Sequence, residues 1–215
     1  MSETLTPSEA SEAAPGWRVL SGHLHLSLDC GSFSGALDFV GQVGRIAEEL
    51  QHHPDIDIRY SRVHLAVASH DVNAFTVRDV RFTTEVSQLV DRLGLIPDHA
   101  RLDALEIAID TLDADSIRPF WRAVLGYEEQ GDDLIDPDRI TPLVWFQQMD
   151  APRPQRNRIH LDVHVPHDEV EGRLAAALDA GGTLVSDAHA PNFWVLADTE
   201  GNEACLCTWQ EAASA

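Results

Sequence analysis

Apolar residues recur along this chain with two different spacings, and the two spacings alternate. Alternation of apolar and polar residues indicates half-buried strands, whereas apolar residues three or four positions apart indicate amphipathic helices. Threonine often begins a helix and glycine often ends one, so Thr76 and Gly94 mark the limits of the last predicted helix. The pattern therefore predicts strand, helix, strand and helix over residues 23–30, 32–53, 59–69 and 76–95. This order is typical of a small α+β sandwich.

After a linker-like stretch the pattern starts again. The order strand, helix, strands occurs twice, so residues 105–150 and 157–209 resemble a duplicated βαβββ unit. We expect an α+β protein with two domains. The predicted parts are a flexible acidic arm (1–14), a first domain (15–96), a linker (97–104) and a second domain (105–210).

Composition narrows the range of functions. The 215 residues are 44% hydrophobic, which is enough for ordinary cores. The net charge is −21 and the sequence contains no lysine. A negative surface disfavours direct binding to nucleic acid, and the lack of lysine excludes Schiff-base chemistry.

No apolar run is long enough to span a membrane, and the N-terminus lacks the pattern of a secretory signal. Three cysteines do not make a disulfide framework, so we expect a cytoplasmic protein.

Histidines gather in one short stretch: residues 51–71 hold four of the eleven in the chain. A helix end, a turn and one strand separate His53 from His70, a path that can bring both imidazoles to one cleft. Histidine exchanges protons near neutrality, so neighbouring imidazoles can act as acid and base. His52 belongs to the same group, and Asp79 on the following helix could orient an imidazole or accept a proton.

Other interpretations of these histidines stay open on spacing alone. A histidine pair at the end of a helix can cap its last carbonyl groups. His64 lies on the strand face opposite Val63 and Leu65, where we expect it to be solvated. A metal site is less favoured, because no Cys, Asp or Glu accompanies the histidines at a familiar zinc spacing.

The stretch AEELQHHPDIDIRYSRVHLAVASHDVNAFTVRD resembles the signature of the pterin-4a-carbinolamine dehydratases, with similarity over about residues 15–95. The shared features are His-His-Pro, a tyrosine, a strand that ends in Ser-His-Asp, and Thr-x-Arg-Asp at a helix start. The resemblance implies an antiparallel sheet and the dehydration of 4a-hydroxytetrahydropterin to quinonoid dihydropterin, without a metal or other cofactor. It also implies that His52, His53 and His70 are catalytic, with Asp79 as their acidic neighbour.

We expect His53 and His70 to transfer protons and His52 to position the pterin. Ile56 stands where the family often has Trp, and Phe75 lies in a loop where the family often has Gly-Gly-Leu-Thr. These departures leave open the alternative that the first half is a non-catalytic module for pterin binding or dimerisation.

The second half resembles a glyoxalase-like domain of the vicinal oxygen chelate superfamily. The resemblance is carried by FWRAVLGYE (120–128), RIHLDVHV (158–165) and LADTEGNEACLC (196–207). It implies a paired βαβββ fold that binds an unidentified small molecule. The partners expected for the whole chain are therefore a pterin, this second small molecule and further copies of the chain in a homo-oligomer.

The superfamily places metal ligands near Glu106 and at His160 of this sequence. Cys205 occupies the position where the superfamily often has a third, glutamate ligand, and Glu203 could replace it. We assign no metal at this stage, and burial in the core is the favoured interpretation of Cys205. A metal-dependent lyase or dioxygenase in this half stays an alternative.

Overall fold

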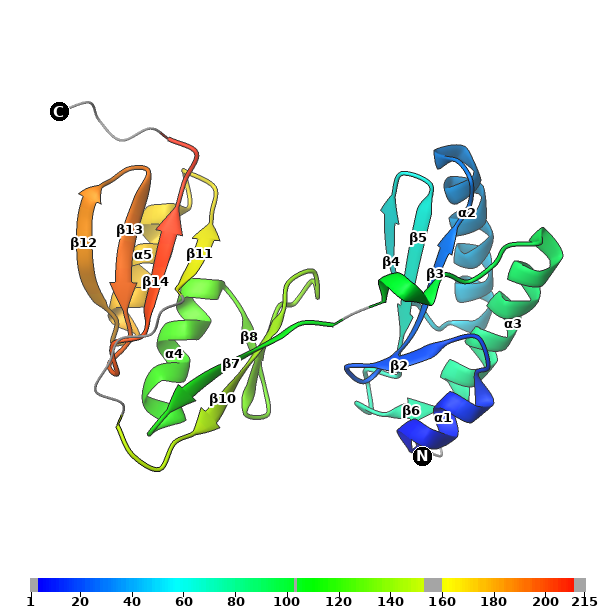
Figure 1. The fold of residues 1–215 in the computed structure, drawn as a ribbon, viewed down its shortest axis with the longest axis horizontal. Coiled ribbons are helices and arrows are strands. Elements are labelled where there is room, and N and C mark those ends of the chain that lie inside the picture. The colour runs from blue at the N-terminus through cyan, green and yellow to red at the C-terminus, as the bar shows by residue number, and fades with distance from the viewer. Residues whose placement is uncertain (1–3, 103, 153–159, 211–215) are drawn as a thin grey trace. The chain divides into compact units, whose positions relative to one another are not determined.

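The computed structural model describes residues 4–102, 104–152 and 160–210 (Figure 1). No helix in these ranges has the length and apolarity needed to cross a membrane. The chain divides into two compact units, and the division falls between Ala104 and Leu105 in the sequence. The elements of the first unit are β1 (Thr4–Leu5), α1 (Pro7–Ala13), β2 (Arg18–Leu20), β3 (His23–Asp29), α2 (Phe33–Leu50), β4 (Asp55–Arg59), β5 (Arg62–Val67), β6 (Phe75–Thr76), α3 (Val77–Leu93) and the 3₁₀ helix η1 (His99–Arg101).

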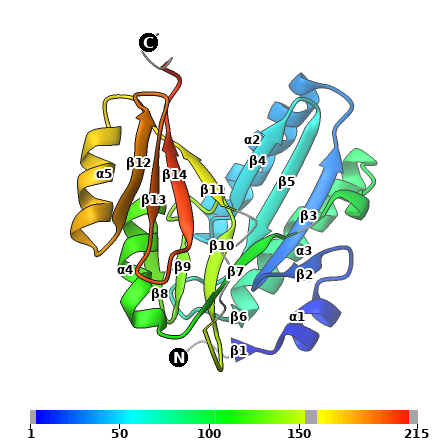
Figure 2. The ribbon, with the colours of Figure 1, turned by 60° about the vertical axis from the view of Figure 1, so that its left-hand side comes forward.

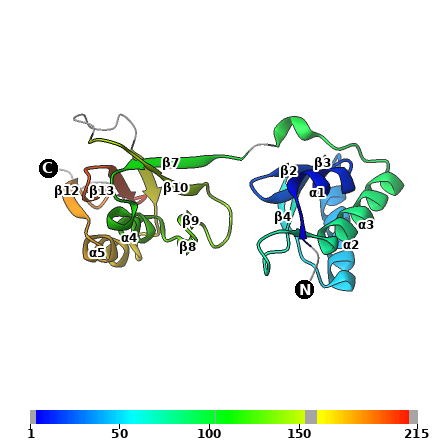
Figure 3. The same ribbon diagram turned by 90° about the horizontal axis from the view of Figure 1, so that it is seen from below.

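The first unit is a two-layer α+β sandwich, as the sequence predicts. Its four-stranded sheet has the order β2-β3-β5-β4 and is antiparallel throughout. Helices α2 and α3 cover one face of this sheet (Figure 3). Alternate residues of β3 and β5 point into the core between the layers, and they are Leu24, Leu26, Leu28, Val63, Leu65 and Val67.

In the expected flexible arm over residues 1–14, the described residues form β1 and α1 and pack on the first unit. Thr6 caps α1 and forms a capping box with Glu9. Ala10 and Ala14 are buried in the core of the first unit. Leu5 pairs with Phe75 through β1 and β6. The acidic composition suggested a solvated arm, but buried alanines and the pairing of β1 with β6 hold this segment on the first unit.

The linker expected over residues 97–104 starts later than predicted. Pro97 pairs with Leu28 at the end of β3, and the Asp98 backbone N–H donates to the carbonyl of Ser27. Arg62 on β5 donates to the Asp98 carboxylate at 2.7 Å. Residues 97 and 98 therefore belong to the first unit.

The sheet face opposite the helices carries a hydrogen-bonded pair of imidazoles. His25 Nδ1 lies 2.9 Å from His64 Nε2, and His25 Nε2 lies 3.1 Å from the carbonyl of Leu20. His64 points away from Val63 and Leu65 as predicted, but it is bonded to His25 rather than simply solvated. Burial and the neighbouring His64 lower the pKa of His25 to about 4.

The second unit is built from two βαβββ repeats, which confirms the predicted duplication. The first repeat consists of β7 (Glu106–Thr111), α4 (Ala114–Leu125), β8 (Glu128–Gln130), β9 (Asp133–Ile135) and β10 (Leu143–Gln148). The second repeat consists of β11 (Leu161–His164), α5 (Val170–Asp179), β12 (Thr183–His189), β13 (Phe193–Ala197) and β14 (Glu203–Cys207).

Each repeat has the same strand order, in which the first strand runs parallel to the last. The two sheets are β7-β10-β9-β8 and β11-β14-β13-β12, and Figure 2 shows β14 between β13 and β11. Helices α4 and α5 lie against each other (Figure 1). Gly182 is required where α5 turns into β12, because a Cβ there would lie 2.4 Å from the Phe120 ring. Residues of both repeats contribute to one core.

Two carboxylates of the turn between β13 and β14 join the two repeats. Asp198 is 3% exposed and accepts a hydrogen bond from Trp121 Nε1 on α4 at 3.0 Å. The same carboxylate accepts bonds from the backbone and side chain of Asn202. Glu200 accepts bonds from the Thr111 hydroxyl and from the backbone N–H of Leu112, just before α4. Asp198 and Glu200, two residues apart in the sequence, therefore connect the second repeat to the first.

Several short strands escaped prediction from sequence. They are β1, β2, β4, β6, β8, β9 and β12. Most have two or three residues, too few to show a period. β12 has seven residues, but six of them are exposed, so it lacks the alternation by which a half-buried strand is recognised.

A pH titration tests the buried imidazole. The folded state keeps His25 neutral down to about pH 4, whereas the unfolded chain takes up this proton near pH 6.5. The free energy of unfolding should therefore fall between about pH 6.5 and pH 4, by on the order of 2 kcal/mol from this group, with the contribution complete above pH 6.5. We expect the His25 resonance to titrate near pH 4 by NMR. His25→Gln should reduce the pH dependence, and a midpoint near 6.5 would contradict the assignment.

Removing the carboxylate between the repeats should destabilise the second unit. In Asp198→Ala the Trp121 and Asn202 donors lose a buried acceptor, so we expect a loss of about 3 kcal/mol in the free energy of unfolding. Denaturant unfolding followed by tryptophan fluorescence measures it. Asp187→Ala, at an exposed position of β12, is the matched control and should change little. Equal stability of the two variants would argue against the connection.

Candidate functional site

The carboxylate of Asp79 lies in the first turn of α3 and is completely buried. It belongs to a capping box: the Thr76 hydroxyl accepts from the backbone N–H of Arg78, and the Thr76 backbone N–H donates to Asp79 Oδ2 at 2.6 Å. Thr76 caps the helix and Gly94, with φ of +64°, ends it, as predicted. The helix N-terminus carries a partial positive charge, which favours a carboxylate at this position.

The same carboxylate binds two other segments of the chain. His52, just after α2, has its Nε2 atom 2.7 Å from Asp79 Oδ1. Ser69, just after β5, donates from its hydroxyl to Asp79 Oδ2 at 2.8 Å and lies 2.8 Å from the Thr76 hydroxyl. One buried carboxylate therefore connects the end of α2, the end of β5 and the start of α3.

The charge of Asp79 is stabilised by these partners. Burial alone would raise the pKa of Asp79. Hydrogen bonds from His52, Thr76 and Ser69 outweigh burial and hold the pKa below its ordinary value. Asp79 is therefore ionised at neutral pH, and it is suited to orienting an imidazole rather than to exchanging protons itself.

The histidine pair after α2 splits into a buried and an exposed member. Gln51 ends the helix in the left-handed conformation, with φ of +49°. His52 is 5% exposed and faces Asp79. His53 is exposed, and its Nε2 atom lies 3.1 Å from the Glu48 carboxylate on the last turn of α2. That His52 positions the pterin stays a prediction; its ring is buried against Asp79, and the exposed imidazole of the pair is that of His53.

His70 is also exposed, in the turn that follows β5. The turn is stabilised by Asp71, which accepts a hydrogen bond from Arg78 on α3, and by the backbone N–H of Asn73, which donates to the carbonyl of His70. Each exposed histidine is thus the chain neighbour of a residue bound to Asp79: His53 follows His52, and His70 follows Ser69. The structure fixes the backbone beside both imidazoles.

The two departures from the resembled signature have different surroundings. Phe75 is 4% exposed and packs in the core of the first unit, opposite Leu5. Its ring therefore contributes to the core beneath the loop. Ile56 on β4 is 37% exposed.

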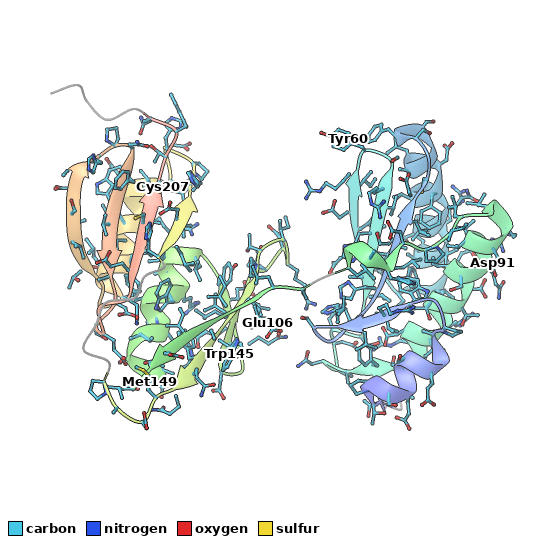
Figure 4. The ribbon with its side chains drawn as sticks, viewed as in Figure 1. Tyr60, Asp91, Glu106, Trp145, Met149 and Cys207 are labelled. Carbon is cyan, nitrogen blue, oxygen red and sulfur yellow. The ribbon has the colours of Figure 1, made fainter. Side chains whose placement is uncertain are left out.

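In the second unit the predicted ligand candidates separate. Glu106 lies at the start of β7, and Figure 4 shows it far from Cys207 on β14. Among the described residues, potential ligand atoms of His160, Asp162 and Cys205 lie within 4.8 Å of one another, a group that contains neither Glu106 nor Glu203. Burial, followed by a hydrogen bond to Asp162, raises the pKa of Cys205 to about 12.

Sequence reasoning missed the role of Ser69 and the participation of Asp162 and Cys205 in one cluster. The Thr76-x-x-Asp79 spacing was a usable signal, because a capping box fixes where the carboxylate lies. Ser69 has no such local signal. Its partner is ten residues away and is recognised only in three dimensions.

Comparison with known families divides the chain at the same place. The profile of the family described as pterin 4 alpha carbinolamine dehydratase matches residues 3–89, and that of the glyoxalase-like domain matches residues 106–207. A protein of Acidobacterium capsulatum, named as a candidate pterin-4-alpha-carbinolamine dehydratase, is 36% identical over 89 residues, which are 40% of this chain and 97% of the relative. A Herpetosiphon aurantiacus protein named in the same way is 35% identical over 81 residues, 38% of this chain and 84% of the relative.

Solved structures resemble each half separately. A Brucella melitensis protein described as a transcriptional coactivator/pterin dehydratase is 32% identical, with a TM-score of 0.38, over 40% of this chain and 98% of its own. A Burkholderia phytofirmans protein of the glyoxalase/bleomycin resistance protein/dioxygenase family is 18% identical, with a TM-score of 0.42, over 51% of this chain and all of its own.

The Asp79→Asn variant tests the buried network. The carboxylate only accepts hydrogen bonds, whereas the amide nitrogen of asparagine donates them. In the variant this nitrogen would face another donor, the N–H of Thr76 or the hydroxyl of Ser69. We expect a loss of about 3 kcal/mol in the free energy of unfolding of the first unit, measured with denaturant. Asp71→Asn, which affects an exposed ion pair beside the same helix, is the control and should have little effect. A stable Asp79→Asn variant would show that the network is not structural.

Proposed function

The chain belongs to the pterin-4a-carbinolamine dehydratase family through its N-terminal half and carries a glyoxalase-like domain in its C-terminal half; from this we propose that the N-terminal half is a hydro-lyase that dehydrates 4a-hydroxytetrahydropterin. The observation that supports the proposal is the buried Asp79 carboxylate, which binds the chain neighbours of two exposed histidines. The product is quinonoid dihydropterin, and water leaves.

The reaction needs two proton transfers, and the exposed imidazoles suit them. The bond between C4a and its hydroxyl oxygen breaks as the oxygen takes a proton from an imidazolium and leaves as water. The ring nitrogen N5 gives up its proton to a neutral imidazole, and a double bond forms between C4a and N5. Histidine can serve in either step near neutral pH. We assign the two transfers to His53 and His70, with either order of roles.

His52 and Asp79 act in this proposal as positioning residues. The His52 ring is bonded to Asp79, and the left-handed backbone at Gln51 places His53 beside it. Ser69 holds the backbone beside His70 to the same carboxylate. A fixed acid and base have a geometric advantage over imidazoles free in solution. Glu48, next to His53, orients that ring further.

The alternative is a module that binds a pterin or associates with further copies without turning over substrate. The residue that favours this alternative is Ile56, which stands at the position where a tryptophan is frequent in the resembled signature.

For the C-terminal half we propose binding of a second small molecule. For the whole chain we propose a homo-oligomer.

Turnover measurements on the full chain test the assignment. We expect the protein to accelerate the loss of freshly generated 4a-hydroxytetrahydropterin, followed by ultraviolet absorbance, well above the spontaneous rate. His53→Ala and His70→Ala should each lower kcat by about a hundredfold, because general acid–base catalysis contributes roughly that much or more. Pterin binding should persist in both variants, measured by fluorescence quenching.

The matched control is His23→Ala, in the same unit but at β3, whose imidazoles lie on the sheet face opposite the helices. It should leave kcat unchanged. Pterin binding without acceleration by the unmodified protein would establish the non-catalytic alternative. Unchanged kcat in both histidine variants would remove His53 and His70 from the mechanism.

A further inference from the structure

The two exposed histidines of the first unit are held in different ways. The His53 ring has its own partner, because its Nε2 atom lies 3.1 Å from the Glu48 carboxylate. Among the residues that the structure describes, no hydrogen bond reaches the ring of His70. The position of the His70 imidazole therefore depends on the backbone of the turn that carries it.

This turn lies open to solvent between its two ends. Ser69 forms an isolated β-bridge with Ala74, and His70, Asp71 and the two residues after them are exposed. The backbone N–H of Asn73 donates to the His70 carbonyl at 3.3 Å. Backbone bonds that water can reach open more easily than buried ones, so contacts from outside the turn decide how firmly it is held.

Arg78, in the first turn of α3, makes such a contact. Its guanidinium donates to the Asp71 carboxylate in the turn, and its Nε atom lies 3.5 Å from the Thr76 hydroxyl oxygen. The backbone N–H of Arg78 donates to the same hydroxyl at 3.1 Å. Arg78 thus connects the exposed turn to the helix cap to which the buried Asp79 carboxylate is bound.

The start of a helix is an unfavourable place for a cation. The first turn carries a partial positive charge, which repels a guanidinium. Asp71 compensates for this repulsion. The hydrogen bond between the two side chains holds the pKa of Asp71 below its ordinary value and raises the pKa of Arg78, and the charge of Asp79 raises the latter further. The location of Arg78 is therefore explained by its partners and not by the helix.

A surface ion pair without a role in function is the simpler interpretation. The Asp71 and Arg78 side chains are 54% and 36% exposed, and exposed pairs contribute little to global stability. That argument concerns unfolding of the whole unit, whereas local opening depends on the contacts of the segment that opens. The ion pair is also electrostatically close to the histidine, because the charge of a protonated His70 helps to lower the pKa of Asp71.

We propose that Asp71 and Arg78 are positioning residues for His70: the guanidinium holds the turn, and the turn holds the imidazole where it can exchange a proton with the pterin. The inference rests on the proposed dehydratase function and extends the site to an ion pair outside the buried network of Asp79. Neither residue touches the substrate in this proposal. Their contribution is the geometric advantage of a catalytic group whose backbone is fixed.

Two variants of the full chain break the ion pair from either side. Asp71→Asn and Arg78→Gln should each raise the hydrogen-exchange rate of the Asn73 amide by about threefold in NMR, since exposed pairs are weak but measurable. Each should lower kcat for 4a-hydroxytetrahydropterin by about fivefold through loss of orientation, with pterin affinity unchanged. The double variant should be no slower than either single variant, because both substitutions remove the same interaction.

A conservative variant and a matched control separate positioning from general structure. Arg78→Lys keeps a cation that can still bind Asp71, so it should recover most of the kcat that Arg78→Gln loses. Lysine and glutamine have similar helix propensities, so an effect on the helix alone would not distinguish them. Asp57→Asn breaks the exposed ion pair with Arg59 on β4 and should change neither amide exchange at Asn73 nor kcat.

Three outcomes would contradict this role. Unchanged exchange of the Asn73 amide in both variants would show that the ion pair does not hold the turn. Faster exchange with unchanged kcat would show that catalysis does not need the turn to be fixed. Absence of turnover by the unmodified protein would overturn the dehydratase assignment and with it the catalytic part of this proposal, whereas the exchange rates would still decide separately whether Arg78 holds the turn.

Discussion

A buried carboxylate needs several hydrogen-bond donors, and the first unit meets this requirement by bringing three chain segments to Asp79. The donors are an imidazole from the end of α2, a hydroxyl from the end of β5 and the backbone N–H at the cap of α3. Removing any of them would leave this buried charge with fewer hydrogen-bond donors, which is costly in an apolar surrounding. The cost of burying the charge thus fixes the relative position of the segments on which the two exposed histidines lie.

The first strand, β1, packs beside the cap of α3, where Asp79 is bound. Thr4 of β1 pairs with Thr76, the residue whose backbone N–H donates to Asp79. The segment that was expected to be a mobile arm therefore packs against the cap of α3. Its helix α1 contributes Ala10 to the core beneath. The segment of β1 and α1 therefore packs directly beside the residue that donates to the Asp79 carboxylate.

The sequence was sufficient where local patterns decide the structure. The apolar spacing located α2 and α3, and Thr76 and Gly94 marked the ends of α3 because each residue type has a direct role there. The duplication in the second half followed from the repeated order of elements. Adjacent histidines are a different case. His52 and His53 share one local pattern, and the backbone at Gln51 decides which ring is buried. Ser69 and Cys205 acquire their roles from partners on other elements, which no local pattern specifies.

The connection through Glu200 has a consequence for the first repeat taken alone. Glu200 belongs to the second repeat, yet its carboxylate accepts the backbone N–H groups of Leu112 and Asp113, just before α4 in the first repeat. The Asp113 side chain makes no cap hydrogen bond of its own. A polypeptide cut off before Glu200 would present these N–H groups to solvent, so the first repeat relies on the second for the start of its helix.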